Sequence, residues 1–197
     1  MYSHPFCRIQ PIKITVTIYT FIIRKSPNPD HMQDEPLTPF KQTAEQLIDL
    51  LSSQESEKLN KKPLNGGWSA AQIGEHILKS YASVETLRGR TEPSQRPADE
   101  KVASIKDLFL DFGIKMQSPV EILPSDNFIS KDGLLEDLKN RIEELKEIIK
   151  TRDLTATCLD FAIPEYGYFT RLEWIWFNIF HTQRHIHQLK HIKIDPH

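Results

Sequence analysis

The segment TRLEWIWFNIFHTQRHIHQLKHI, residues 170–192, predicts a long apolar helix near the end of the chain. Thr170 is followed three residues later by Glu173, which is the spacing of a capping box. In that motif the hydroxyl and the carboxylate bond the backbone N–H groups that the first helical turn leaves unpaired. We therefore expect the helix to begin at Thr170 and the other helices to pack around it.

One face of this predicted helix combines large apolar residues with two histidines. At about 100° per residue, a single stripe contains Trp174, Asn178, His181, His185, Leu189 and Ile192. His181 and His185 therefore point where the apolar side chains point, which is inward. Two imidazoles one turn apart suit a shared metal ion, but such a pair needs a third ligand from elsewhere in the chain.

A second predicted helix supplies a candidate for that third ligand. Ser69 and Gln72 form another capping box, so this helix is expected to begin at Ser69. Its inward stripe consists of Ile73, His76, Ile77, Ser80, Val84 and Leu87. His76 thus shares an apolar face with core residues, as His181 and His185 do. The three histidines are the predicted metal ligands.

Two more amphipathic helices complete the pattern. One is expected to begin with Thr38 as its N-cap and Pro39 at the first helical position, where the missing N–H costs nothing. The other is expected to follow Ser130 and to end near Arg152, with an apolar seam close to a heptad repeat and charged residues on its other face. The charged face is interpreted as solvated surface.

The connections between these helices differ in length. Residues 89–98 are interpreted as an exposed connection, residues 102–112 as a short helix, and residues 120–123, between two prolines, as an extended piece. Residues 153–169 are interpreted as a loop. The sequence therefore predicts an all-α fold, a four-helix bundle over residues 37–193 with a long crossover between the second and third main helices.

The composition fits one globular domain in a reducing compartment. The chain has 197 residues, 39% of them hydrophobic, and a formal net charge of −2. Because no stripe of Lys and Arg is interleaved with aromatic residues, binding to nucleic acid or to an anionic membrane is disfavoured. Cys7 and Cys158 match no disulfide framework or zinc-binding spacing, so we expect a cytoplasmic protein.

Residues 1–36 differ from the rest and are expected to form a poorly ordered or weakly packed extension. Ile12–Ile23 is rich in β-branched residues, which favours a strand, and is too short to cross a bilayer as a helix. No small-residue cleavage site follows this apolar run, which disfavours a signal peptide. Met32 is an alternative natural start, in which case residues 1–31 are a translated upstream extension.

Three neutral imidazoles without an obligatory carboxylate suit a borderline-soft divalent ion, above all zinc or nickel, with an open position for water. The pKa of such a water can fall to ~7, which makes hydroxide, or a bound thiolate, available at neutral pH. A single histidine on an apolar face is more often a hydrogen-bonded core residue, but three on compatible faces favour a metal site. The sequence HTQRH lacks the glutamate of HExxH, so a protease of that type is not supported.

Other polar residues flank the candidate ligands. Asn178 and Gln188 lie about one turn from the histidines and could orient a ligand, although packing at the core edge is the simpler interpretation. Arg184 could hold an anionic substrate group or cover the edge of the bundle. The candidates for proton transfer, which the sequence does not rank, are Tyr81, Glu165 and Tyr166.

The remaining candidates have simpler interpretations. His187 and His191 point away from the histidine pair and are expected at the surface or rim. Cys158 has no base at a fixed spacing and is interpreted as a buried structural thiol.

Two segments carry a resemblance to a known family. The first, GGWSAAQIGEHIL, spans residues 66–78, and the second, PEYGYFTRLEWIWFNIFHTQRHIHQL, spans residues 164–189. In order and spacing the chain from about Leu37 to Ile192 resembles the DinB-like (YfiT-like) metalloenzyme family. The resemblance implies a four-helix bundle with a three-histidine metal centre, carried here by His76, His181 and His185. Residues 1–36 have no counterpart in that pattern.

The resemblance also implies two kinds of reaction. Family members that this chain resembles include metal-dependent hydrolases and S-transferases that use bacillithiol or mycothiol. We therefore expect a hydrolase or an S-transferase with a small-molecule substrate, a divalent metal ion and, for the transferase, a low-molecular-weight thiol. The alternative is a helical bundle that binds a metal or small ligand without turnover. A homodimer formed through an exposed apolar strip is compatible with the sequence.

Overall fold

A computed structural model describes residues 36–64 and 66–193. The strand predicted for Ile12–Ile23 and the alternative start at Met32 lie outside the described residues, as does nearly all of the extension predicted for residues 1–36.

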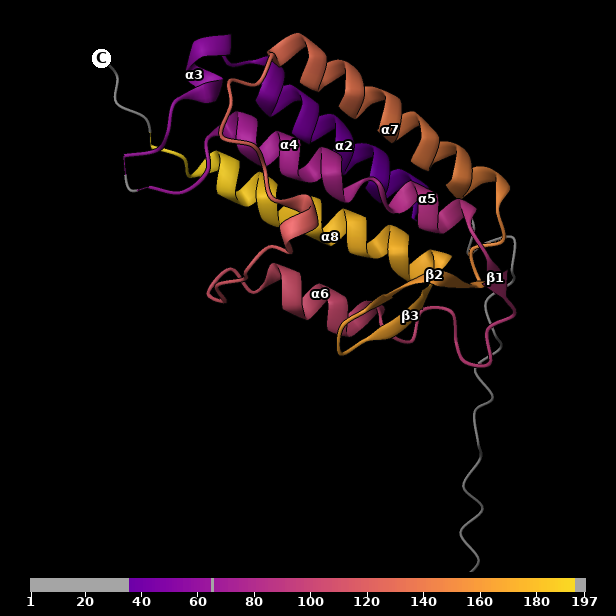
Figure 1. The fold of residues 1–197 in the computed structure, drawn as a ribbon. Helices are drawn as coiled ribbons and strands as arrows, with labels where there is room; N and C mark the ends of the chain where they lie inside the picture. Colours follow the sequence, from indigo (N-terminus) through magenta and orange to yellow (C-terminus); the bar gives the residue numbers. More distant parts are fainter. Residues whose placement is uncertain (1–35, 65, 194–197) are drawn as a thin grey trace, which may run out of the picture.

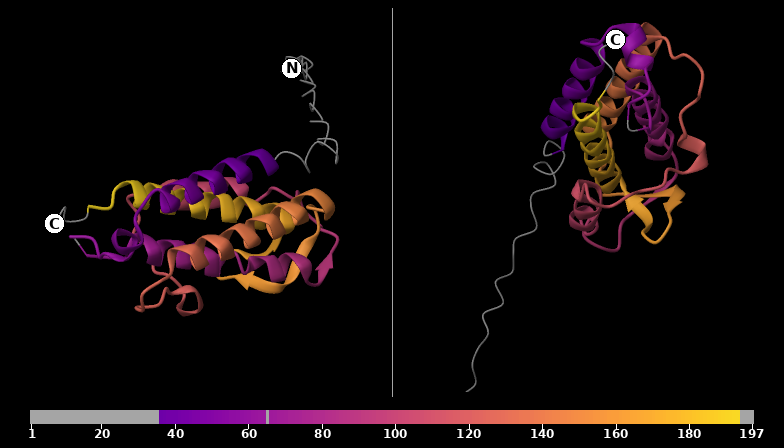
Figure 2. Two further views of the ribbon diagram at one scale, coloured as in Figure 1. Left: turned by 90° about the horizontal axis from the view of Figure 1, so that it is seen from above. Right: turned by 90° about the vertical axis from the view of Figure 1, so that its left-hand side faces the viewer.

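Four main helices lie side by side and form the bundle (Figure 1). They are α2 (Leu37–Ser52), α4 (Ala70–Ser80) with its continuation α5 (Ser83–Arg88), α7 (Lys131–Thr151) and α8 (Arg171–Lys190). Helices α2 and α4 each pack against both α7 and α8, as the end-on view in Figure 2 shows. The fully buried side chains between them include Leu47, Leu51, Ile73, Ile77, Leu138, Leu145, Ile175 and Ile179. The predicted all-α four-helix bundle is confirmed.

The two capping boxes begin α4 and α8 where the sequence predicts. In α4, the Gln72 N–H donates to Ser69 Oγ at 3.2 Å, and the Ser69 N–H donates to Gln72 Oε1 at 3.1 Å. In α8, the Glu173 N–H donates to Thr170 Oγ1 at 3.1 Å, and the Thr170 N–H donates to Glu173 Oε2 at 2.9 Å. These bonds fix the rotational start of both helices that carry histidines.

The start of the first helix differs from the prediction. Helix α2 begins at Leu37, with Pro36 rather than Thr38 at its N-cap and no side-chain cap. Pro36 already has helical angles, φ −81° and ψ −13°, and its carbonyl accepts from the Phe40 N–H at 2.9 Å. A proline that pre-forms the helical φ thus replaces the predicted hydroxyl cap. The polar run that follows contains the short helix α3 (Ser56–Asn60).

The second main helix is interrupted, whereas the sequence pattern suggested one continuous helix. Between α4 and α5 the backbone makes tighter bonds three residues apart, from the Ala82 N–H to the Lys79 carbonyl at 3.1 Å and from the Val84 N–H to the Tyr81 carbonyl at 3.1 Å. In addition, Ser80 Oγ donates to the Ile77 carbonyl at 2.8 Å. Such local bonds compete with the regular α-helical ladder and bend the helix.

Residues 153–169 are not the loop that the sequence suggested. They contain strand β2 (Thr157–Ile163) and the start of β3 (Gly167–Thr170), which form an antiparallel hairpin with Ala162 opposite Tyr168. Strand β1 (Thr91–Glu92) pairs with the other side of β2. The turn places Glu165 at φ 68° and Gly167 at φ 70°, so it reverses the chain tightly between two strands.

The crossover between α5 and α7 runs past α8 and returns over α4. Helix α6 (Val102–Leu110) packs against α8, which confirms the predicted short helix (Figure 1). The piece predicted as extended instead begins with a single 3₁₀ turn, η1 (Val120–Ile122), which contacts α4. Within residues 36–64 and 66–193, no helix combines the length and the apolar character needed to cross a bilayer.

Candidate metal centre

The fold brings the three predicted histidines together in the bundle. His76 comes from α4, and His181 and His185 come from successive turns of α8. The Nε2 atom of His181 lies 3.0 Å from His76 Nε2 and 3.0 Å from His185 Nε2. The three rings are almost completely buried, with exposed fractions of 2%, 6% and 8% for His76, His181 and His185. Among the described residues, they form the one group of three or more potential metal-ligating side chains.

Hydrogen bonds on the outer side of two rings determine which nitrogen carries the proton. His76 Nδ1 lies 2.8 Å from the Ile122 carbonyl, and His185 Nδ1 lies 3.0 Å from Gln188 Oε1. Because both oxygens only accept, both Nδ1 atoms donate, and the Nε2 lone pairs face the third ring. His181 Nδ1 is buried and has no hydrogen-bond partner. The protein therefore orients the outer two ligands and leaves the central one without support from a side chain.

The site keeps all three imidazoles neutral. Burial is the main cause that lowers the pKa of each ring, and for His185 the pKa falls to about 3. Neighbouring histidines and Arg184 lower the pKa of His181 and His185 further, while Lys79 does so for His76. A neutral imidazole is the form that ligates a metal.

The donor set fits a metal ion. A neutral imidazole has a single N–H, and two of the three rings use it on the outer side, so the facing nitrogens cannot all be paired by hydrogen bonds among themselves. Nitrogens that share one ion at bonds of about 2.0–2.1 Å lie roughly 3.0–3.4 Å apart, which agrees with the separations of 3.0 Å from His181 Nε2 to His76 Nε2 and to His185 Nε2. The donor set, three nitrogens without a carboxylate, suits a borderline-soft divalent ion.

Aromatic rings surround the histidines. The Trp68 ring lies 4.8 Å from that of His76 and 6.4 Å from that of His185, measured between ring centres. On the other side, the rings of Phe109 and Phe177 lie 5.3 and 5.8 Å from that of His181. These apolar walls reduce the local dielectric and so strengthen electrostatic interactions inside the site.

The crossover approaches the site at two places. Near α4, Ser118 Oγ lies 3.5 Å from His76 Nδ1, on the same side as the Ile122 carbonyl. Near α8, Arg184 donates to the carbonyls of Phe109 at 3.1 Å and of Asp111 at 2.9 Å, and also to that of Ile114. The guanidinium of Arg184 thus holds the end of α6 and the segment after it.

The other flanking residues point to different partners. Asn178 Nδ2 donates to Ser83 Oγ at 3.0 Å, and Tyr81 Oη lies 2.9 Å from Thr182 Oγ1. Burial raises the pKa of Tyr81 to about 12, which opposes its ionisation. Glu165 is exposed in the turn of the β2–β3 hairpin. Asn178 and Tyr81 therefore bond to partners within the bundle, whereas Glu165 lies on the exposed hairpin turn.

The surface histidines and the cysteine agree with their simpler interpretations. The His187 ring stacks on Phe112, with ring centres 3.8 Å apart, and His191 Nδ1 donates to the His187 carbonyl at 2.7 Å. Cys158 is a buried free thiol whose pKa burial raises to about 11. A thiol with a raised pKa is a poor nucleophile at neutral pH.

Two contributors to the site were missed by sequence reasoning. The Ile122 carbonyl is a backbone group in an irregular segment, and no residue type identifies such an acceptor. Trp68 carries no metal-ligating atom and so gives no signal by residue type, but its position just before α4, eight residues before His76, places its ring against two of the three histidines.

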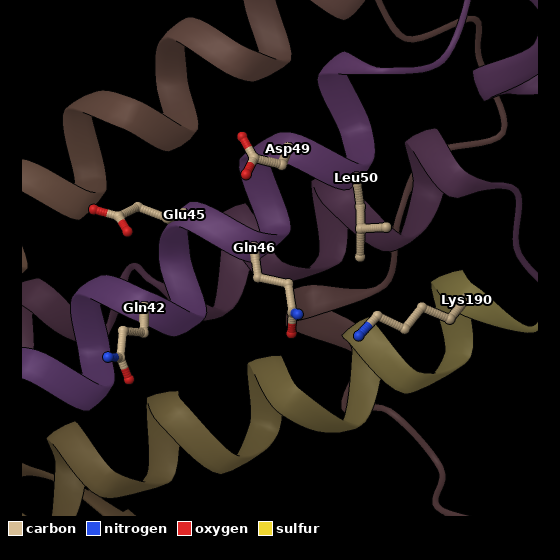
Figure 3. A pocket seen from close by; sticks show the side chains of 6 residues that line it. All are labelled: Gln42, Glu45, Gln46, Asp49, Leu50 and Lys190. Atoms are coloured by element: carbon tan, nitrogen blue, oxygen red, sulfur yellow. The ribbon is translucent and has the colours of Figure 1, made fainter.

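A surface hollow elsewhere on the bundle is separate from this centre. Figure 3 shows it between α2 and α8, lined by Gln42, Glu45, Gln46, Asp49, Leu50 and Lys190. Five of its six lining residues are polar or charged, and none of them is one of the three histidines. The hollow therefore does not change the assignment of the candidate site.

Comparisons with known proteins agree with this arrangement. The model of the DinB superfamily matches residues 40–189, a range that contains all three histidines. The chain is also similar to the uncharacterized protein YuaE of Bacillus subtilis (strain 168), with 27% identity over 147 residues that cover 73% of this chain and 88% of YuaE. No solved structure gave a significant match.

Proposed function

The chain belongs to the DinB superfamily, and from this premise we propose that it is a divalent-metal-dependent enzyme centred on His76, His181 and His185. The observation that supports the proposal is the convergence of three neutral, buried Nε2 atoms, two of them 3.0 Å from the third. When bound, the ion would supply Lewis-acid activation of water or of a low-molecular-weight thiol.

The residues of this chain would prepare the site before any substrate binds. The Ile122 carbonyl and Gln188 Oε1 hold His76 and His185 in the tautomer that presents Nε2 to an ion. Trp68, Phe109 and Phe177 exclude bulk water from around the rings. Zinc and nickel are the ions that this donor set favours.

The proposed reaction is the attack of an activated water or thiol on a small electrophile, which makes the protein a hydrolase or a thiol S-transferase. The alternative is a bundle that binds a metal or small ligand without turnover. The supporting observation for the alternative is the closure of the site, since no histidine of the three is more than 8% exposed. The cytoplasmic location and the homodimer stay predictions.

Metal content tests the first part of the proposal. Protein purified without chelator is expected to contain about one divalent ion per chain, measured by elemental analysis. The variant His181→Ala is expected to lose it, because His181 is the ring that both others face. His187→Ala is the matched control, since His187 lies on the same helix and stacks on Phe112 away from the site. Absence of metal from the parent protein would overturn the proposal.

A turnover assay separates the enzyme from the binding module. Metal-loaded protein is incubated with simple esters and amides, and separately with thiol cofactors and small electrophiles. The enzyme reading expects turnover that disappears on metal removal and in His181→Ala but persists in His187→Ala. Metal binding without metal-dependent turnover in either series would favour the non-catalytic alternative.

A further inference from the structure

One face of α4 carries a polar stripe that includes a metal-ligand candidate. Gln72, the adjacent pair Glu75 and His76, and Lys79 follow one another at intervals of three residues along the helix, so they lie on one side of it. All four side chains bond to the crossover where it returns over α4. The crossover groups that they bond lie within residues 122–126, with Ser118 Oγ as a further contact of His76.

The stripe binds chiefly the backbone of this segment. Glu75 Oε2 accepts from the Ser125 N–H at 2.6 Å, and Lys79 Nζ donates to the Leu123 carbonyl at 2.7 Å. Gln72 Nε2 donates to the Ser125 carbonyl at 2.8 Å. The segment is thus held in a fixed place against α4 even though it makes only a 3₁₀ turn and no regular ladder.

The same segment supplies the acceptor that orients His76. The Ile122 carbonyl lies three residues before the Ser125 N–H that Glu75 binds, and His76 is the residue next to Glu75. His181 and His185 are fixed relative to each other by one helix, but His76 belongs to another. The position of the His76 ring relative to the other two therefore depends on α4 and on the Ile122 carbonyl.

We propose that Glu75 is a positioning residue of the metal centre: by binding the Ser125 amide it places the Ile122 carbonyl where that carbonyl orients His76. The proposal rests on the metal site proposed above. Glu75 is favoured over its neighbours because its two carboxylate oxygens make two different contacts that hold residues 122–126 against α4. One binds Ser125, and the other lies 3.3 Å from Lys79 Nζ, which holds Leu123. Gln72, in contrast, also closes the α4 capping box.

Two conservative variants separate the effect of the side-chain length of Glu75 from the effect of its charge. Glu75→Gln keeps the length and an acceptor oxygen for Ser125 but removes the charge. Glu75→Asp keeps the charge but is one methylene shorter, so its oxygens withdraw from the Ser125 amide. A positioning role predicts a zinc affinity within about twofold of the parent for Glu75→Gln and a loss of about tenfold for Glu75→Asp.

Three measurements make the comparison specific. Zinc dissociation constants come from competition with a chromophoric chelator, and the visible spectrum of the cobalt-substituted protein reports the geometry at the ion. Glu75→Asp is expected to shift that spectrum, whereas Glu75→Gln is expected to preserve it. Urea unfolding of the metal-free variants measures any general loss of stability. The matched control is Glu85→Asp, because Glu85 is ion-paired on α5, at 3.2 Å from Arg141, and within the described residues makes no hydrogen bond to residues 122–125.

Each outcome decides the proposal. Equal zinc affinity and an unchanged cobalt spectrum in Glu75→Asp would overturn it. Equal weakening in Glu75→Gln and Glu75→Asp would also overturn it, because a variant that keeps the reach to the Ser125 amide would then lose as much affinity as one that does not. A parent protein that binds no zinc would instead defeat the metal site itself, so the two proposals fail in different ways.

Discussion

The two ends of helix α8 bury polar groups in opposite ways. At its start, Glu173 is fully buried and accepts four hydrogen bonds, from the Thr170 and Lys101 backbone N–H groups at 2.9 Å each and from Arg96 Nη1 and Nη2 at 2.6 and 2.7 Å. The two hydrogen bonds that Arg96 donates to the Glu173 carboxylate raise the pKa of Arg96. About two and three turns further on, respectively, His181 and His185 are buried as neutral rings.

The two regions differ in whether the chain itself pairs every buried polar group. The Glu173 carboxylate has its counter-charge and its donors within the chain, as buried charges require. Around His181, by contrast, lone pairs face one another and Nδ1 has no partner. A buried polar group that the protein leaves unpaired calls for an explanation, and a bound cation provides one here.

A second unpartnered group lies near the start of α8 and has a simpler explanation. Trp174 Nε1 is buried without a hydrogen-bond partner. Its ring, however, lies among those of Phe161, Phe169 and Phe177, at centre distances of 6.1, 5.4 and 5.4 Å. A single neutral N–H among aromatic faces can make weak N–H···π contacts. It therefore does not point to a charged ligand.

The largest expected effect on stability comes from removing the counter-charge of Glu173 at the start of α8. Arg96→Ala would leave Glu173 buried without its counter-charge, which we expect to lower the free energy of unfolding by about 3–5 kcal/mol. The measurement is urea unfolding followed by circular dichroism. Arg88→Ala is the control, because the Arg88 pair with Glu144 is partly exposed, and its loss should stay below about 1 kcal/mol. Similar losses in the two variants would contradict the importance assigned to the Glu173 network.

The three buried histidines should instead make the stability of the metal-free protein sensitive to acid. The pKa of His185 is about 3 when folded, below the usual value of 6.5, so the unfolded chain binds more protons between these limits. Stability from His185 is therefore fully present above pH ~6.5 and is lost as the pH falls toward the folded pKa, by up to about 1.4 kcal/mol per pH unit. His76 and His181, whose pKa values are also lowered, act in the same direction.

Urea unfolding of the chelator-treated protein at pH 7.5, 6.5 and 5.5 measures this dependence. His185→Gln removes one titrating ring. The free energy of unfolding of this variant should therefore fall less steeply below pH ~6.5 than that of the parent, and the difference in slope should be about 1.4 kcal/mol per pH unit at most. His191→Gln is the control, since His191 is exposed on the last turn of the same region. Parallel pH dependences for the parent and His185→Gln would show that His185 is not buried as a neutral ring.

The parts of this molecule that could be predicted from sequence are those that local rules determine. The capping boxes at Ser69 and Thr170 were predicted correctly because each uses side chains only three residues apart. The approach of His76 to His181 follows from two such starts, because a helix of known phase fixes which residues face inward. The bundle itself follows from the apolar stripes.

The errors occurred where longer-range or backbone interactions decide. The hairpin β2–β3 was interpreted as a loop because Pro164 and Gly167 are turn residues, yet a turn between two strands uses them equally well. The break after Ser80 depends on local bonds that the continuing apolar stripe hides. Arg184, for which the sequence offers either an anionic substrate group or cover of the bundle edge, donates to backbone carbonyls of the crossover. The sequence contains no signal for those carbonyls.

The smallest effect on folding, and the sharpest contrast with Arg96, is expected at Gln188. Its side chain is exposed, so Gln188→Ala should change the free energy of unfolding of the metal-free protein by less than about 0.5 kcal/mol. Gln188 Oε1 nevertheless orients His185 through Nδ1, and water can replace the acceptor without fixing the ring. We therefore expect a zinc affinity about tenfold lower, the lower end of the range for such outer acceptors.

The control for this last variant is Gln183→Ala, because Gln183 lies on the same helix but donates to Thr43 Oγ1, at 3.4 Å, on α2. Chelator competition measures zinc affinity and urea unfolding measures stability in both variants. Loss of zinc affinity in Gln188→Ala, without loss of stability, would show that the two regions of α8 have separate roles. The contacts of Arg96 would then stabilise the fold, and the contact of Gln188 would strengthen metal binding. An unchanged zinc affinity would mean that the orientation of His185 comes from packing against Trp68 rather than from its hydrogen bond.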